Sequence, residues 1–190
     1  MRFPFLPTLL VTASVAAMAN LGFWQLDRKQ QKQALIAQYR ANAALPPIAW
    51  PAVPPADGSL LYRRATGFCL EPAGWRAAAG RNAAGETGWI HIAACRTGAE
   101  RPAMQVNMGW SRSGTAPVGW RGGRVSGVIV PDRLHQIRLD SAVPAPGLQA
   151  AARPAAPSPG NHLSYAIQWF FLAAAAAVIY GLALRRRLRP

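Results

Sequence analysis

The sequence predicts an α+β membrane protein in which two transmembrane helices, N-terminal and C-terminal, flank an antiparallel, barrel-like β domain. Two uncharged apolar stretches predict the helices, because Phe5 to Leu26 and Leu163 to Leu184 each match the ~20 residues that cross a bilayer. Between them, short apolar runs alternate with glycine-rich turns, which is typical of strands. The part between the two stretches is long enough for one modest domain.

The first apolar stretch has a second interpretation as a secretory signal. Arg2, the apolar run and Ala17-Met18-Ala19 resemble a signal with its cleavage site. The hydrophobicity continues past that point through Phe23 and Trp24, where a cleaved signal usually ends. We therefore favour a retained anchor. Leu26 to Tyr39 has no helix breaker, so the helix should continue as a polar extension until Pro46 and Pro47.

These patterns divide the chain into seven segments. They are a cytoplasmic N-terminus (residues 1–4), a transmembrane helix (5–26), a helical extension and proline-rich linker (27–59), an extracytoplasmic β domain (60–141), a second proline-rich linker (142–162), a transmembrane helix (163–184) and a basic cytoplasmic tail (185–190). The predicted strands are Tyr62 to Leu70, Gly74 to Gly80, Gly88 to Cys95, Pro102 to Trp110, Gly123 to Val130 and Gln136 to Leu139. Partial alternation within them favours an antiparallel sheet with one covered face.

The net charge of +14 comes almost entirely from arginine. Nucleic acid, anionic lipid and an acidic protein all bind such an excess, but the arginines are scattered and form no basic run interleaved with aromatics, which argues against nucleic acid. The basic residues that follow the second span place the C-terminus in the cytoplasm, whereas those that follow the first favour a cytoplasmic central domain. Because long segments cross largely regardless of charge, we place both termini inside. The residues that set this conflict are Arg185, Arg186, Arg187 and Arg189 against Arg28, Lys29, Lys32 and Arg40.

Two cysteines, Cys69 and Cys95, leave two interpretations open, a disulfide or a pair of buried thiols. No HExxH or CxxC motif is present, and no serine lies in a nucleophile elbow, so the sequence predicts no enzyme. His91 and His135 are interpreted as a strand histidine and a turn histidine rather than metal ligands.

Polar and aromatic residues enter the start of the second span. His162, Tyr165 and Trp169 are spaced i, i+3 and i+7, so they should share one helix face, with the amide of Gln168 deeper in the membrane. A neutral imidazole at this position can ligate haem iron, and aromatic rings can pack on a porphyrin. The alternative is an ordinary aromatic belt at the headgroup level, which such a composition often forms.

The end of the first span carries Trp24, Gln25 and Arg28. Antiparallel spans would bring this segment to the same membrane surface as His162. The combined site therefore comprises Trp24, Gln25, Arg28, His162, Tyr165, Gln168 and Trp169. The Arg28 guanidinium suits a haem propionate, although a phospholipid phosphate fits it equally well.

At these residues the sequence resembles the Surfeit-locus-one family of cytochrome c oxidase assembly proteins, called Shy-one in fungi. The motifs are Leu-Gly-x-Trp-Gln-x-x-Arg-x-x-x-Lys over residues 21–32 and Asn-His-Leu-x-Tyr-Ala-x-Gln-Trp-Phe over residues 161–170. Weaker matches are Gly67-Phe68, Val106 to Trp110 and Gly-x-Val-x-Gly over residues 123–127. The chain departs from the family at Met108, where arginine is common, and at Gly160, where asparagine is common.

The resemblance implies a multi-pass protein of the bacterial cytoplasmic membrane with a periplasmic central domain, or of the mitochondrial inner membrane in a eukaryote. It implies a chaperone that assists haem a delivery or insertion into oxidase subunit I, with His162 matching the histidine to which haem binding is attributed in bacterial members. Expected partners are subunit I, the lipid bilayer and, as a further candidate, haem a synthase. The alternative function is a membrane scaffold that binds nascent oxidase subunits without touching haem.

Overall fold

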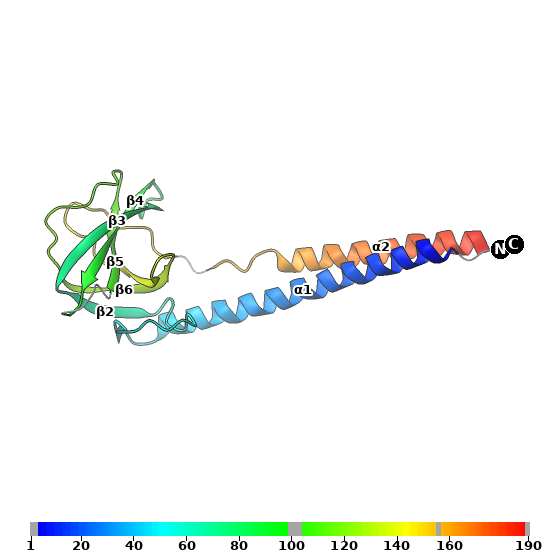
Figure 1. Ribbon diagram of the computed structural model, residues 1–190, viewed down its shortest axis with the longest axis horizontal. Helices are drawn as coiled ribbons and strands as arrows, with labels where there is room; N and C mark the ends of the chain where they lie inside the picture. Colours follow the sequence, from blue (N-terminus) through cyan, green and yellow to red (C-terminus); the bar gives the residue numbers. More distant parts are fainter. Residues whose placement is uncertain (1–3, 99–103, 155–156, 189–190) are drawn as a thin grey trace. The chain divides into compact units, whose positions relative to one another are not determined.

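A computed structural model describes residues 4–98, 104–154 and 157–188 (Figure 1). Its elements are α1 (Phe5–Ala44), β1 (Ile48–Ala49), β2 (Arg64–Cys69), β3 (Glu71–Arg81), β4 (Thr87–Arg96), β5 (Met104–Ser111), β6 (Gly123–Asp132), β7 (Gln136–Ser141) and α2 (His162–Leu188). The chain forms two units, one of residues 1–36 with 157–190 and one of residues 37–156. The predictions for Met1 to Phe3, for Pro102 and for Arg189 lie outside the described residues.

The first unit is an antiparallel pair of helices. The Thr8 and Tyr180 hydroxyls hydrogen-bond at 2.6 Å near one end, and the side chains of Gln25 and His162 meet near the other. Between these contacts the helices approach closely, because a Cβ atom on Gly22 would lie 2.6 Å from the Phe170 ring. Phe23 also packs edge-to-face on Phe170, with ring centroids 5.1 Å apart. Small residues thus permit close contact between the two helices.

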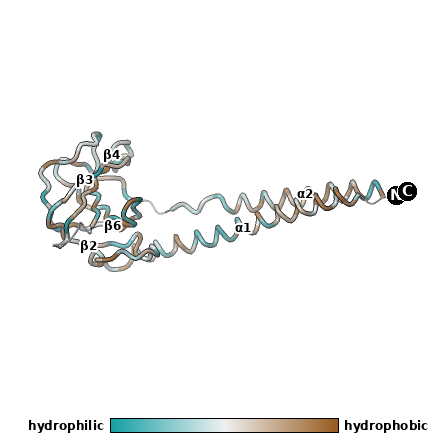
Figure 2. The backbone as a smooth tube through the Cα atoms, viewed as in Figure 1, coloured by the Kyte–Doolittle hydropathy of each residue, from teal (hydrophilic) through white to brown (hydrophobic). Residues whose placement is uncertain are grey.

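Both helices contain long hydrophobic stretches (Figure 2), and many of their large apolar side chains are exposed. Both helices are long and apolar enough to span a membrane, and only 6% of each apolar window is buried. Exposed side chains on α2 include Ile167, Phe171 and Ile179. A helix that is apolar all round is normally covered by a protein core or by lipid, and within the first unit these side chains have no such core.

The second unit is built on a seven-stranded sheet in the order β1-β2-β6-β7-β5-β4-β3. Each of the six predicted strands falls on an observed strand, with ends that differ by a few residues. The prediction of an antiparallel sheet was wrong in part, because the sheet is mixed: four pairings are antiparallel, but β1 pairs with β2 and β5 pairs with β7 in parallel. A long connection, residues 112–122, follows β5 and allows the β6–β7 hairpin to insert between β2 and β5, which orients β7 parallel to β5. Hydrophobic alternation gives no information on strand direction.

The barrel prediction was also wrong in part, since the sheet is strongly curled but not closed. Strand β2 continues through Leu70 into β3, and the Leu70 N–H donates to the Arg96 carbonyl, so one corner of the sheet folds over. From that corner β2 and β3 diverge, and the sheet order ends at β3. No strand pairing joins β3 to β6 in the described part of the chain.

The core of this unit is closed by a disulfide between Cys69 and Cys95, which decides the question that the sequence leaves open. Both cysteines are fully buried, together with Met104, Ile129 and Leu139. Because β2 and β4 are not neighbours in the sheet, the disulfide joins two strands across its curl. Apolar side chains from five strands pack around it.

The two proline-rich segments differ from the linkers that we predicted. The first contributes β1, at the edge beside β2. In the second, Ala145 is buried and Gln149 exchanges backbone hydrogen bonds with Trp110 of β5. A Cβ atom on Gly109 would lie 2.7 Å from the Gln149 carbonyl, so glycine lets this segment approach β5. Proline excludes helix but does not exclude packing against a sheet edge.

Candidate functional site

The central feature of the helix pair is a hydrogen bond between Gln25 and His162. Gln25 Oε1 lies 2.9 Å from His162 Nδ1. Because a carbonyl oxygen only accepts, the imidazole donates through Nδ1, and in the neutral ring this leaves Nε2 with a free lone pair. Histidines that ligate metals usually have their second nitrogen fixed by such a partner.

A groove of about 420 Å³ lies beside this histidine, lined by Arg28, Gln31, Lys32, Leu35 and His162. Its two cations and apolar floor give it the character of a site for an amphipathic anion. Gly160 adopts a left-handed conformation with φ of 75°, and a Cβ atom there would lie 3.3 Å from His162 Nε2. Glycine therefore keeps the chain close to this nitrogen and leaves space beside it.

The other predicted residues occupy different positions around the two helices. Trp24 is exposed, and the Arg28 guanidinium lies over its ring, 5.8 Å from the centroid. Trp169 is half-buried on the helix face that includes His162, whereas Tyr165 is exposed about a sixth of a turn away. Gln168 is exposed on the outer surface of α2. Of the predicted residues, Arg28 and His162 line the groove, and Gln25 is hydrogen-bonded to His162. The lining does not include Trp24, Tyr165, Gln168 or Trp169.

The predicted site left out three residues that line this groove, Gln31, Lys32 and Leu35, although Lys32 ends the first family motif. Gln31 accepts a hydrogen bond from Arg28 at 3.0 Å. A signal was present, since residues 25, 28, 32 and 35 recur at the i, i+3, i+7 and i+10 spacing of one helix face. That spacing continues the face of Gln25 into the polar extension.

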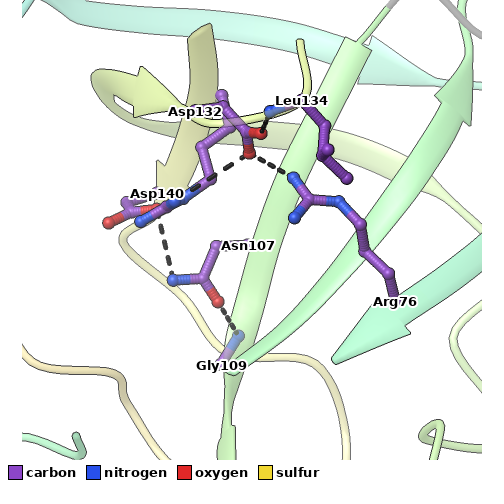
Figure 3. Close-up of polar contacts among 7 residues, drawn as sticks. Arg76, Asn107, Gly109, Asp132, Leu134 and Asp140 are labelled. Atoms are coloured by element: carbon purple, nitrogen blue, oxygen red, sulfur yellow. Dashed lines mark hydrogen bonds and ion pairs between the residues drawn. The ribbon is translucent and has the colours of Figure 1, made fainter. Parts of the chain in front are cut away.

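A second polar cluster lies in the sheet unit, centred on Asp132 at the end of β6 (Figure 3). Its carboxylate accepts hydrogen bonds from the Leu134 N–H and from Arg76 of β3, and Arg138 lies 3.9 Å away. Burial alone raises the pKa of Asp132, but these hydrogen bonds and the charges of Arg76 and Arg138 outweigh it, so the pKa lies below its usual range. The pair of Arg76 with Asp132 connects β3 to β6 where no strand pairing does.

The cluster extends to β5 and β7 through neighbouring side chains (Figure 3). Arg138 donates to Asp140 at 2.8 Å, and the Asn107 amide donates to the same carboxylate at 3.2 Å. Asn107 in turn accepts from the Gly109 N–H. The carboxylates and the Asn107 amide are thus satisfied by neighbours, as is usual inside a protein, whereas the buried Nε of Arg76 has no hydrogen-bond partner among the described residues.

A buried histidine and a partly buried serine also lie side by side in the sheet, but they do not form a nucleophile and base. His91 Nε2 is 2.8 Å from Ser111 Oγ, and the Ser111 hydroxyl donates to the Ser113 carbonyl at 2.6 Å. The serine proton is already used, so His91 Nε2 donates to Ser111 and cannot accept its proton. Burial lowers the pKa of His91, with a smaller opposing contribution from the Ser113 backbone.

No group of three histidine, cysteine or acidic side chains that could hold a metal ion occurs among the described residues. A metal held by His162 would therefore have to bring its other ligands with it, as iron in a porphyrin does. The free Nε2 and the adjacent Arg28 and Lys32 suit the iron and the carboxylates of a haem, respectively. The donor set at this groove therefore fits that group.

Two terminal apolar helices that flank an open mixed sheet define a class compatible with a membrane-bound accessory protein. The chain belongs to the SURF1 family, whose family model matches residues 12–174. This family is associated with cytochrome oxidase assembly and is an assembly-factor family rather than a known catalytic one. A comparison with curated proteins found no match.

Proposed function

We propose that this protein is an integral membrane factor that holds haem a at the His162 groove during assembly of a haem-copper cytochrome c oxidase. The observation that carries the proposal is the 2.9 Å hydrogen bond from His162 to Gln25, which fixes the imidazole with Nε2 free beside Arg28 and Lys32. Membership of the SURF1 family supports the link to the oxidase. Oxidase subunit I is the proposed recipient of the haem.

The spacing of polar contacts along the helix pair supports the membrane part of this proposal. Gln25 lies 17 positions after Thr8, and Tyr180 lies 18 positions after His162. At ~1.5 Å per residue the two polar ends are ~26 Å apart, close to the ~30 Å hydrocarbon core. The stretch between them carries no charged residue on either helix. The groove would then lie at the membrane boundary, on the periplasmic side in a bacterium, and both termini in the cytoplasm.

Each residue at the groove would have a different role in binding haem a. When bound, haem a would supply an iron that accepts a nitrogen ligand and two propionate carboxylates that accept hydrogen bonds. His162 Nε2 would ligate the iron, and Arg28 and Lys32 would pair with the carboxylates. Gln25 would hold the imidazole in the required tautomer, so it is a positioning residue rather than a ligand. Trp24 would hold the Arg28 guanidinium by a cation–π contact.

The test is the visible spectrum of the full chain purified from cells that make haem a. We expect a haem a spectrum in the wild type, its loss in His162→Ala and a weaker one in Gln25→Leu. The matched control is His135→Ala, which removes an exposed histidine from the β6–β7 turn. Wild-type protein without haem, or equal haem in wild type and His162→Ala, would contradict the proposal.

A second candidate function, a membrane scaffold for nascent oxidase subunits that does not touch haem, is favoured by Gln168. This amide is exposed among apolar side chains of α2 such as Ile167 and Phe171, and it makes no hydrogen bond within the part of the chain that the structure describes. In lipid an unpaired amide is costly, so a helix of another protein would satisfy it. Haem binding is not needed for such contact.

The two candidates separate in a crosslinking experiment. A photoreactive residue at Ile167 should crosslink to oxidase subunit I in the membrane, and Gln168→Leu should reduce the yield. If the protein is only a scaffold, crosslinking and oxidase activity both survive His162→Ala. If haem is held, His162→Ala preserves crosslinking but lowers the haem a content of subunit I.

A further inference from the structure

The outer edge of β3 is an unpaired strand edge. The sheet ends at β3, and the described residues pair with its outer edge only near Asn82, through the hydrogen bonds of Arg81 and Ala83 to residues 150–152. The Asn82 N–H points toward β4, so by alternation the N–H and C=O groups of Ala77 and Ala79 point outward. Both of these alanines are exposed. Residues 73–80 contain no lysine or proline, which natural edges often use to prevent pairing.

A cleft lies along this edge, in the opening between β3 and the end of β6. It consists of two adjoining hollows, of about 590 and 290 Å³, which share Ala79, Ile90, Pro131 and Arg138 in their lining. Alanine and isoleucine give the cleft an apolar floor. Pro131 has no N–H, so on the β6 side the opening lacks one backbone donor, whereas the β3 side offers a regular ladder.

The rim of the cleft is basic. Among the described residues, four arginines and two carboxylates line the two hollows, and they are Arg76, Arg81, Arg133, Arg138, Asp132 and Asp140. The carboxylates are already engaged by Arg76 and Arg138. Arg133 is exposed in the β6–β7 turn and has no ion-pair or hydrogen-bond partner among the described residues. The cleft therefore retains net positive charge beside an open strand edge.

We propose that this cleft binds an extended acidic segment of a partner protein, which adds a strand to the outer edge of β3. The backbone of Ala77 and Ala79 would form the ladder, and Arg133 would pair with an acidic side chain of the added strand. Charge complementarity selects this occupant. A second copy of the chain would bring another set of arginines to the same edge, and like charges in close contact are unfavourable. The inference does not depend on haem binding.

The experiment uses the full chain in detergent micelles and a fluorescein-labelled peptide of alternating glutamate and valine, with binding followed by fluorescence anisotropy. We expect saturable binding that weakens as salt rises, and no binding of the peptide with lysine in place of glutamate. Arg133→Glu should weaken binding about tenfold, since it replaces an attraction with a repulsion. The matched control is Arg121→Glu, the same change at an exposed arginine outside the cleft, which should leave binding unchanged.

Strand addition is distinguished from simple charge attraction by N-methylation of alternate peptide residues. One of the two alternately methylated peptides should lose binding, because its methyl groups face β3, and the other should keep it. Hydrogen exchange should slow at the Ala77 and Ala79 amides and not at Ala78, which already faces β4. Equal binding of both methylated peptides, an equal effect of Arg121→Glu, or a dimer that pairs through β3 would overturn the proposal.

Discussion

The helix pair and the sheet unit place their polar groups in opposite ways. In the helix pair the apolar side chains face outward, and side-chain hydrogen bonds between the helices lie near the two ends, at Thr8 with Tyr180 and at Gln25 with His162. In the sheet unit the apolar side chains face inward around a disulfide. Its buried polar groups are joined in the cluster centred on Asp132. The difference is that expected if the helix pair lies in lipid, as proposed, and the sheet unit lies in water.

Because of this contrast, different mutations and conditions should destabilise the two regions. The sheet unit depends on covalent closure, buried ion pairs and pH, because water drives its folding and also titrates its side chains. In the proposed membrane setting, the helix pair would depend on close contact of small residues, since lipid provides no hydrophobic force between helices.

Removal of the disulfide should have the largest effect, and only on the sheet unit. In Cys69→Ala/Cys95→Ala the unfolded chain regains the freedom of a loop whose ends are 26 residues apart, which predicts a loss of about 3 kcal/mol. Urea unfolding followed by near-ultraviolet circular dichroism measures it. The helical signal at 222 nm should persist through this transition, and simultaneous loss of both signals would show that the two regions are not independent.

Breaking the Asp132 cluster should be the next largest effect. Asp132→Ala leaves Arg76 and Arg138 without their shared carboxylate, whose side chain is 1% exposed, while that of Arg76 is 26% exposed. Partial access of water to Arg76 reduces the usual penalty for such a break to about 2 kcal/mol of unfolding free energy. Glu71→Gln is the control, because the ion pair of Glu71 with Arg96 is exposed and should cost less than about 0.5 kcal/mol.

The helix pair should respond instead to the size of Gly22. Gly22→Leu forces the Phe170 ring away from α1, which should weaken the helix contact by about 1–2 kcal/mol. Disulfide formation between Thr8→Cys and Tyr180→Cys in the membrane reports this contact. Gly181→Leu serves as the matched control, because a Cβ atom there meets nothing within 4 Å, and it should leave the crosslinking rate unchanged.

The smallest effect should be a pH dependence of the sheet unit through His91. Since burial lowers its folded pKa below the ordinary 6.5, the unfolded chain binds the proton more readily. The contribution of neutral His91 to the free energy of unfolding is full above pH 6.5 and is lost as pH falls from there toward the folded pKa. The free energy of unfolding then changes by at most ~1.4 kcal/mol per pH unit. The free energy of unfolding of His91→Gln should no longer change with pH in this range. The loss of stability below pH 3.8, which Asp132 causes, should remain. An unchanged slope between pH 6.5 and 5 would contradict the assignment.

Much of the fold could be predicted from local pattern. Uncharged runs and the positions of prolines predicted both helices, and glycines between short apolar runs predicted six of the strands. The parallel pairing of β5 with β7 and the edge position of β1 could not be predicted, because both depend on where a connection crosses the sheet. The disulfide was undecidable for the same reason, since Cys69 and Cys95 meet only when the sheet curls.

The candidate site shows a similar division. The juxtaposition of Gln25 with His162 was predicted from antiparallel spans, and the structure places them in hydrogen-bonding contact. Helical spacing alone did not separate His162 from Tyr165, because it does not say where the neighbouring helix lies on a broad face. Their roles in binding stay predictions. The sequence did not predict the Asp132 cluster or the open edge of β3, since the residues around them come from four strands.

By itself the sequence determined which segments are apolar enough to leave water, where the backbone must turn and which motifs place the chain in its family, because these properties reside in residues close together along the chain. Only the tertiary structure decided that His162 donates to Gln25, that the sheet stays open beside β3 and that the two cysteines join. Each of these depends on a distance between residues far apart in sequence, and such distances are set by packing rather than by local preference.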